Sequence, residues 1–325
     1  MKEVENEDNL KLFDKARSGD RIAMGRLLSV VENQAIETLD LIQKKGVLSH
    51  DCCIIGLTGP PGAGKSSLID CLLDIWKKEQ KKVAVLAVDP SSPFSGGAVL
   101  GDRVRMLSHC HDKNILIRSL GTRGHLGGLS ACIGEAIEVL IALGMEIVLI
   151  ETAGAGQIDV EIAEVTDTTI VVLVPGWGDT MQVAKAGLLE IADIYVINKM
   201  DQPGAETAAR DIELMLDYRQ TSGWIPKVTQ TRADTGDGVD KLWQHIQEHQ
   251  DYLTTSGERM TRRQRHIGYL IRRMAFAQLS STWNKATLWD LAGRVMSKEI
   301  DFTQATNIAL EMLRNDVKEV LNEIY

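Results

Sequence analysis

A lysine and a serine that directly follow a glycine-rich turn are the residues of this chain best suited to phosphate chemistry. Residues 59–64 read Gly-Pro-Pro-Gly-Ala-Gly, and the whole stretch fits the phosphate-loop spacing G-x-x-x-x-G-K-[ST]. Glycines let backbone N–H groups curl around a polyphosphate, the lysine reaches the β- and γ-phosphates, and the serine hydroxyl ligates Mg²⁺. The stretch predicts a nucleotide-binding site formed by Gly59, Pro60, Pro61, Gly62, Ala63, Gly64, Lys65, Ser66 and Ser67.

The residues on either side supply the structural context that this match needs. Residues 53–58 form a short apolar run with the length of a buried strand, and residues 67–73 carry apolar side chains at helical spacing. The N-terminus of a helix adds a partial positive charge that favours phosphate. A strand, a glycine turn and a helix in this order distinguish a phosphate loop from a chance Gly/Pro-rich turn.

Two aspartates further along are candidate Mg²⁺ ligands. Asp89 ends the second predicted strand, where a carboxylate beside a phosphate loop can hold the ion or a water in its shell. Asp102 lies in a segment with Arg103 and Arg105, which either neutralise phosphate charge or form surface ion pairs. His125, in a glycine-rich loop, is either a switch residue or merely structural, and the sequence leaves this open.

A third acidic residue, Glu151, ends the strand predicted at 146–151. Gly154 follows it closely, and this is the arrangement of a Walker B segment that senses the γ-phosphate. We expect Glu151 to hold Mg²⁺ through water or to orient the attacking water, and the Gly154 N–H to contact the γ-phosphate. Gln157 is a further candidate for positioning that water, although a loop glutamine commonly only faces solvent.

The sequence Asn198-Lys199-Met200-Asp201 follows another predicted strand and indicates which base is bound. The Asp201 carboxylate can accept two hydrogen bonds from guanine, one from its ring N–H and one from its exocyclic amine. Adenine presents an acceptor in place of that N–H and lacks the amine, so it would leave the carboxylate unpaired. In this order after a phosphate loop, the motif predicts GTP as the ligand.

Together these motifs resemble the MeaB/ArgK family of P-loop GTPases, which includes the human methylmalonic aciduria type A protein. The resemblance covers nearly the whole chain and is carried by residues 89–93, 101–106, 151–157 and 198–201. It implies a homodimeric GTPase that acts as a chaperone for an adenosylcobalamin-dependent acyl-CoA mutase, usually methylmalonyl-CoA mutase. In that family, GTP use gates cofactor loading and protects or reactivates the mutase.

The resemblance also implies roles for single residues. Residues 176–187 match a mobile third switch that contains Asp179 and Lys185, although these two could equally belong to a solvated loop and helix. The family's Mg²⁺ and catalytic positions are matched by Lys65, Asp89, Asp102 and Glu151.

The chain departs from the family pattern on the base side. A Ser-Ala pair usually follows the next strand and backs the base, whereas residues 231–234 here read Thr-Arg-Ala-Asp. Arg232 and Ala233 therefore occupy this part of the nucleotide site, where the backbone role can persist with different side-chain contacts. Trp177 also stands where the family has a small residue, within the predicted partner-facing switch.

Alternating apolar runs and helical patterns must position all of these residues. Between residues 50 and 250 they predict a mostly parallel α/β sheet with helices on both faces, whose C-terminal strand ends hold the ligand. We expect an N-terminal helical extension over 1–48, a P-loop GTPase domain over 49–250 and a C-terminal helical dimerisation arm over 251–325. The predicted strands are 53–58, 83–88, 115–120, 146–151, 169–174, 193–198 and 227–230.

The composition narrows the partners and the compartment. A net charge of −9 argues against a nucleic-acid-binding face, so we expect the arginines of 259–265 to form a solvated or dimer-facing helix end. Five cysteines without regular spacing indicate buried free thiols in a reducing compartment. There is no recognisable leader and no apolar run of membrane-spanning length, so we expect a cytoplasmic protein with no membrane partner.

The sequence favours a GTP-hydrolysing switch over two alternatives. A metallochaperone GTPase of the nickel-insertion type should carry a His-rich tract or a paired-cysteine metal site, whereas the seven histidines here are scattered. A kinase or transport-associated ATPase is disfavoured by Asp201. No arginine finger is evident from the order of residues, so we expect slow intrinsic hydrolysis that the mutase partner accelerates.

Overall fold

The chain forms two compact units, residues 1–266 and residues 267–325. The computed structural model describes residues 2–44, 52–89, 106, 108–109, 111–121, 132–152, 154, 158–176, 188–218, 223–282 and 285–312. The predicted divisions at 48/49 and 250/251 stay predictions. The helices are α1 (Lys2–Arg17), α2 (Arg21–Lys44), α3 (Lys65–Lys78), α4 (Ile133–Ala142), α5 (Ile158–Glu161), α7 (Leu188–Ile191), α8 (Ala205–Asp217), α9 (Val239–Ser256), α10 (Glu258–Thr282) and α11 (Lys285–Met296), with a 3-10 turn at Ile162–Glu164.

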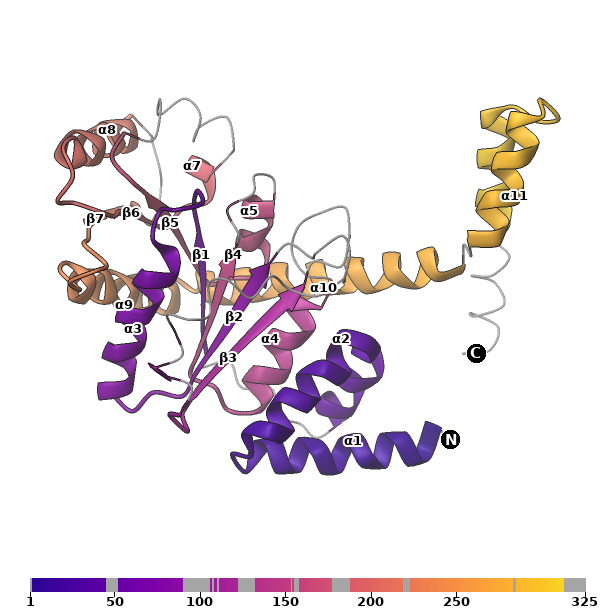
Figure 1. Cartoon of the computed structure of the whole chain (residues 1–325), viewed down its shortest axis with the longest axis horizontal. Coiled ribbons are helices and arrows are strands. Elements are labelled where there is room, and N and C mark those ends of the chain that lie inside the picture. Colours follow the sequence, from indigo (N-terminus) through magenta and orange to yellow (C-terminus); the bar gives the residue numbers. More distant parts are fainter. Residues whose placement is uncertain are drawn as a thin grey trace. The chain divides into compact units, whose positions relative to one another are not determined.

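A seven-stranded sheet in the order β3-β2-β4-β1-β5-β6-β7 forms the centre of the first unit (Figure 1). Its neighbouring strands pair in parallel, so their C-terminal ends meet along one edge. The predicted α/β fold is confirmed, and each predicted strand boundary lies within one residue of the observed one. The strands are β1 (Cys53–Thr58), β2 (Val83–Asp89), β3 (Ile115–Gly121), β4 (Ile147–Thr152), β5 (Thr168–Leu173), β6 (Ile194–Ile197) and β7 (Lys227–Gln230).

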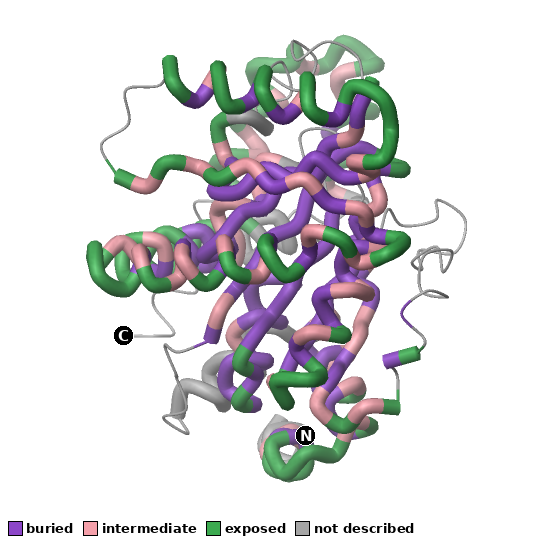
Figure 2. The backbone as a smooth tube through the Cα atoms, turned by 90° about the vertical axis from the view of Figure 1, so that its left-hand side faces the viewer, coloured by how far each residue is buried: buried purple, intermediate pink, exposed green. Residues whose placement is uncertain are grey.

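The central strands are buried on both faces, as Figure 2 shows by their purple colour. Successive side chains of a strand point to opposite faces, so Val172 of β5 joins the core beneath α3 and α9, whereas Val171 joins the core beneath α8. Trp76 of α3 and Trp243 of α9 meet edge to face, with ring centroids 5.6 Å apart. Burial on both faces explains why these strands read as continuous apolar runs.

The N-terminal helices are held to the sheet by packing and by one ion pair. Helix α1 packs on α2, and α2 packs on α4. The Asp20 carboxylate caps α2 by accepting hydrogen bonds from two backbone N–H groups of its first turn. Arg118 of the edge strand β3 donates to Glu32 and to Ser29 of α2, each at 2.9 Å. These contacts fix the first half of α2 against β3 and α4 within the first unit.

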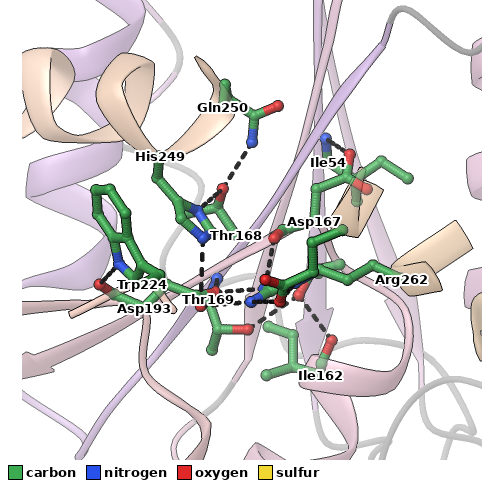
Figure 3. Close-up of polar contacts among 12 residues, drawn as sticks. Ile54, Ile162, Asp167, Thr168, Thr169, Asp193, Trp224, His249, Gln250 and Arg262 are labelled. Carbon is green, nitrogen blue, oxygen red and sulfur yellow. Dashed lines mark hydrogen bonds and ion pairs between the residues drawn. The ribbon is translucent and has the colours of Figure 1, made fainter. Parts of the chain in front are cut away.

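Two aspartates at the N-terminal ends of β5 and β6 bind two consecutive arginines of α10. Figure 3 labels Asp167, Asp193 and Arg262. Arg262 donates to both carboxylate oxygens of Asp193, at 2.7 and 2.8 Å. Arg263 donates to Asp167 at 2.9 Å and to the carbonyl of Cys52 at 2.6 Å. Burial raises the pKa of the Asp167 carboxyl, and the neighbouring Arg263 guanidinium opposes that rise.

The expectation that this arginine cluster is solvated or dimer-facing is therefore wrong for Arg262 and Arg263. Only 8% of Arg263 is exposed, because the buried Asp167 carboxylate requires a cationic partner. Arg259 also bonds internally, to the side chain of Gln250 at 2.8 Å, whereas Arg265 is exposed.

The cysteines match their prediction in part. Cys52, Cys53, Cys71 and Cys132 are free, and Cys110 lies outside the described residues. Cys52 and Cys132 are buried, whereas Cys53 and Cys71 are partly exposed. Burial raises the pKa of the Cys52 thiol to about 12, so it stays protonated at neutral pH. Within the described ranges, every helix is too short or too polar to cross a membrane.

The buried His249 makes the stability of the first unit sensitive to acid. Its Nδ1 lies 2.9 Å from the Thr168 hydroxyl, and its ring packs on Trp224. Burial lowers the pKa of His249 to about 4 from an ordinary 6.5, although Asp193 opposes this shift. Between these two values the unfolded chain binds a proton that the folded chain does not. The free energy of unfolding should therefore fall, by up to about 3 kcal/mol, as pH drops through this window.

Urea unfolding of wild type and His249→Asn at several pH values measures this effect. The asparagine keeps a polar group near Thr168 but cannot titrate, so its acid sensitivity should be weaker by that amount. His111→Gln, which removes an exposed histidine, should follow the wild-type curve. Equal pH dependence in wild type and His249→Asn would contradict the prediction.

Candidate nucleotide-binding site

The phosphate loop connects β1 to α3 at the C-terminal edge of the sheet. Its last glycine, Gly64, has a φ of 90°, which L side chains rarely adopt. A Cβ at this position would overlap the Nδ2 atom of Asn198, so glycine is required for two reasons. The loop can therefore approach the end of β6, which carries the predicted base-reading motif.

Lys65, the first residue of α3, lies buried against this loop. Only 7% of it is exposed, and its Nζ donates to the carbonyls of Gly59 and Pro60, at 2.8 and 3.1 Å. A buried ammonium group is costly unless oxygen atoms or negative charge surround it. The partial positive charge of the α3 N-terminus adds to that of Lys65, and the two together favour a polyanion. The observed position of Lys65, at the start of α3 and against the phosphate loop, therefore suits its predicted role in phosphate binding.

Ser66 and Glu151 come together although they lie on different elements. The Ser66 hydroxyl donates to the Glu151 carboxylate at 2.7 Å, and only 7% of Glu151 is exposed at the end of β4. A hydroxyl and a carboxylate beside a phosphate loop are the hard oxygen donors that suit Mg²⁺. These two side chains would hold the ion with phosphate oxygens and waters. Among the described residues, there is no group of three or more His, Cys, Asp or Glu side chains suited to a metal.

Gly154 brings the chain after β4 against the phosphate loop. Its φ is 76°, and a Cβ at this position would overlap the Gly59 carbonyl oxygen and lie 3.0 Å from Lys65 Nζ. The backbone of this segment therefore passes next to the Nζ atom of Lys65. This proximity suits the predicted contact between the Gly154 N–H and a γ-phosphate.

Asn198 joins the phosphate loop to the loop after β7. Its Nδ2 donates to the Ala63 carbonyl at 2.8 Å, and its Oδ1 accepts from the Thr231 hydroxyl and the Ala233 N–H, both at 3.1 Å. Only 2% of Asn198 is exposed. These bonds make Asn198 a brace between two loops. The predicted base-reading role of Asn198 stays a prediction.

Asp201 and Arg232 lie close together at the base-side loops. Lys199 has a φ of 58°, in the left-handed region, and Asp201 follows it with 46% of its side chain exposed. The Arg232 Nε lies 3.7 Å from Asp201 and donates to Asp234 at 2.9 Å. The Ala233 carbonyl accepts a hydrogen bond from Cys71 of α3 at 3.1 Å. The predicted base-side residues are thus neighbours in space.

Several predicted site residues cannot be placed. Strand β2 ends at Asp89, one residue beyond the predicted bound, and pairs there with Gly121 of β3. The Asp89 side chain is not among the described ones. The remaining predicted residues outside the described ranges are Asp102, Arg103, Arg105, His125, Gln157, Trp177, Asp179 and Lys185. Their predicted roles stay predictions.

The sequence reasoning missed three residues that shape the site. The Thr152 hydroxyl donates to Thr58 at 2.8 Å and ties the end of β4 to the end of β1. Cys71 supports the Ala233 loop as described above. Thr152 lies within the motif at 151–157 but had no predicted role, and no motif marks Thr58 or Cys71. Their partners are distant in sequence. For Thr58 and Thr152, the feature of the sequence that could have drawn attention to them is a threonine at, or directly after, the end of a predicted strand.

The fold and this edge define a class of protein, the P-loop GTPases. A family model described as "Methylmalonyl Co-A mutase-associated GTPase MeaB" matches residues 24–287. The chain belongs to this family.

Known relatives extend along most of the chain. A Pyrococcus horikoshii protein whose name carries the word GTPase is 40% identical over 311 residues, covering 93% of this chain and 98% of that one. GTPase ArgK of Escherichia coli is 35% identical over 269 residues, covering 79% and 80%. The mouse mitochondrial methylmalonic aciduria type A homolog is 40% identical over 215 residues, covering 65% and 52%. The crystal structure of a LAO/AO transport system kinase shares the fold, with a TM-score of 0.68, 23% identity and coverage of 94% and 97%.

A methyl group at Gly154 tests whether this backbone position serves the phosphate site. Gly154→Ala should lower the rate of GTP hydrolysis by about 100-fold, the scale that a misplacement of about 1 Å produces, because its Cβ pushes against the phosphate loop. Steady-state phosphate release measures this rate.

Gly144→Ala is the matched control for backbone strain. Gly144 has a φ of 82° and no atom within 4 Å of a Cβ, so this change should cost about 1 kcal/mol of stability and leave hydrolysis unchanged. A wild-type hydrolysis rate in Gly154→Ala would contradict the assignment.

Proposed function

We propose that this chain hydrolyses GTP with Mg²⁺ and acts as a switch for an adenosylcobalamin-dependent acyl-CoA mutase. The partner that we propose is methylmalonyl-CoA mutase. The observation that supports hydrolysis at this edge is the contact of Lys65, Glu151 and Gly154 with one phosphate loop and its first helical turn. The description of the family as mutase-associated supports the partner. In this proposal, GTP use gates cofactor loading and protects or reactivates the mutase.

The chemistry is the attack of water on the γ-phosphorus. A bond forms from the water oxygen to phosphorus, the bond to the bridging oxygen breaks, and GDP and phosphate leave. The Lys65 ammonium group and the N–H groups of the loop balance the negative charge of the transition state. Mg²⁺, when bound to Ser66 and Glu151, would neutralise charge on the β- and γ-phosphates. Asp89, Asp102, Glu151 and Gln157 remain the candidates for orienting the water.

The base side of the site supports guanine. In our proposal, the Asp201 carboxylate accepts two hydrogen bonds from guanine, one from the ring N–H and one from the exocyclic amine. The neighbouring Ala233 backbone is held in place by Asn198. Nucleotide exchange would alter the predicted third switch with Asp179 and Lys185, which faces the mutase. A cytoplasmic location suits the free cysteines described above.

Turnover measurements with and without the partner test the proposal. The purified chain alone should hydrolyse GTP slowly, because no arginine finger is evident from its sequence, and the mutase should accelerate GTP but not ATP hydrolysis. Intrinsic turnover of order 10 s⁻¹ would contradict a partner-dependent switch, since GTPases without such help are far slower.

The same measurement separates the two alternative functions. ATP turnover equal to GTP turnover would favour a kinase or transport ATPase. GTP-selective turnover that no adenosylcobalamin-dependent mutase changes would leave the GTPase standing and favour a metal-insertion target.

We also propose that the second unit mediates a homodimer. Trp289, Met296 and Phe302 are each at least 80% exposed there, and such apolar side chains commonly mark an interface. Replacing Trp289 and Phe302 together by Asp should weaken self-association by about 100-fold or more, measured by sedimentation equilibrium.

Ile22→Asp is the matched control because Ile22 is an exposed apolar residue of the first unit, 70% accessible. It should leave the association constant unchanged. A wild-type chain that stays monomeric at all concentrations, or a double variant that associates normally, would overturn the proposed dimer.

A further inference from the structure

The carboxylate proposed to read guanine lies on the surface and needs an orienting partner. Nearly half of the Asp201 side chain is exposed, and the loop that carries it begins at the left-handed Lys199. An exposed carboxylate exchanges between rotamers, and fixing it when the base binds costs conformational entropy. A neighbouring group that holds its orientation beforehand would strengthen guanine binding.

Arg232 is fixed in place beside this carboxylate. Its Nε and one terminal nitrogen donate to the two oxygens of Asp234, at 2.9 and 3.2 Å. Its backbone N–H donates to Asp237 at 2.9 Å, and its carbonyl accepts from Gly236 at 2.9 Å. The hydrogen bond from Arg232 lowers the pKa of Asp234, so this pair stays charged at neutral pH. The Arg232 side chain therefore extends from a turn that backbone hydrogen bonds hold in place, and its bonds to Asp234 orient the guanidinium group.

The distance between Arg232 and Asp201 orients the carboxylate without occupying it. The Nε lies 3.7 Å from Asp201 Oδ1, beyond the range of a hydrogen bond but within that of an ion pair. Its directional hydrogen bonds go to Asp234 instead. Both oxygens of Asp201 thus keep lone pairs for the two N–H groups of guanine.

We propose that Arg232, held by Asp234, is a positioning residue that orients Asp201 for guanine recognition. This inference rests on the proposed reading of guanine by Asp201. It adds a specificity determinant on the loop after β7, where the family's usual Ser-Ala pair is replaced. It also makes guanine selectivity depend on salt, because ions screen an exposed pair.

Titrations with GDP, IDP and ADP test this proposal by calorimetry on the full chain. The base of IDP lacks the exocyclic amine of guanine, so it can give Asp201 only one hydrogen bond. In Arg232→Ser, the Kd for GDP should rise about fivefold and that for IDP roughly twofold or less, as expected for an exposed ion pair. The preference for GDP over IDP should therefore fall, and high salt should reduce it in wild type more than in the variant.

Two further variants keep the test informative if Arg232→Ser is poorly folded. Arg232→Lys retains the charge but not the fork to Asp234, so it should recover part of the preference for GDP over IDP. Asp234→Asn keeps the arginine at position 232 but removes the charge of its partner. This variant should also lose part of the preference for GDP over IDP. Arg210→Ser removes an exposed arginine of α8 and should bind GDP, IDP and ADP as wild type does.

The outcomes distinguish this inference from the proposed function. A wild-type chain that binds ADP as tightly as GDP would contradict guanine reading by Asp201 itself. A wild-type preference for GDP that is unchanged in Arg232→Ser, or an equal loss for GDP and IDP, would overturn only the role of Arg232.

Discussion

The hydrogen bonds of one buried carboxamide, that of Asn198, hold the nucleotide-binding edge together. Its nitrogen binds the phosphate loop, and its oxygen binds the loop after β7 through Thr231 and Ala233. A buried amide with unsatisfied atoms would be costly, so this arrangement favours one relative position of the two loops. The phosphate and base ends of a nucleotide would therefore meet a preformed site. The requirement for glycine at position 64 follows from the same close approach.

Polar contacts fix the N-terminal ends of β5 and β6 and the C-terminal end of β6. At their N-terminal ends, Asp167 and Asp193 pair with Arg263 and Arg262 of α10. At the C-terminal end of β6, Asn198 holds the phosphate loop. The apolar cores on both faces of the sheet hold these strands in position, and the polar contacts at the strand ends fix the adjoining loops.

The sequence predicted the sheet because its strands are buried on both faces. Continuous apolar runs such as 147–150 and 170–173 leave little choice of structure, and glycine turns limit their length. The phosphate loop was equally predictable, since its spacing is local and follows from backbone geometry. Lys65 and Ser66 therefore lie at the start of the helix that the spacing predicted, and Glu151 lies near the end of a predicted strand. Local rules of this kind act within about ten residues.

Tertiary structure alone decided how distant polar groups pair. Asn198 and Ala63 are 135 residues apart, and Arg263 and Asp167 are 96 apart, so no spacing in the sequence indicates either contact. For that reason the sequence did not predict the pairing of the α10 arginines or the bracing contacts of Asn198. The sequence by itself determined the fold class and the phosphate loop, and it predicts through Asp201 a preference for guanine. Which loops meet at the edge of the sheet was decided only by the order and parallel register of the strands. Parallel pairing places the C-terminal ends of β1, β5, β6 and β7 side by side, and the loops that follow these strands therefore come into contact.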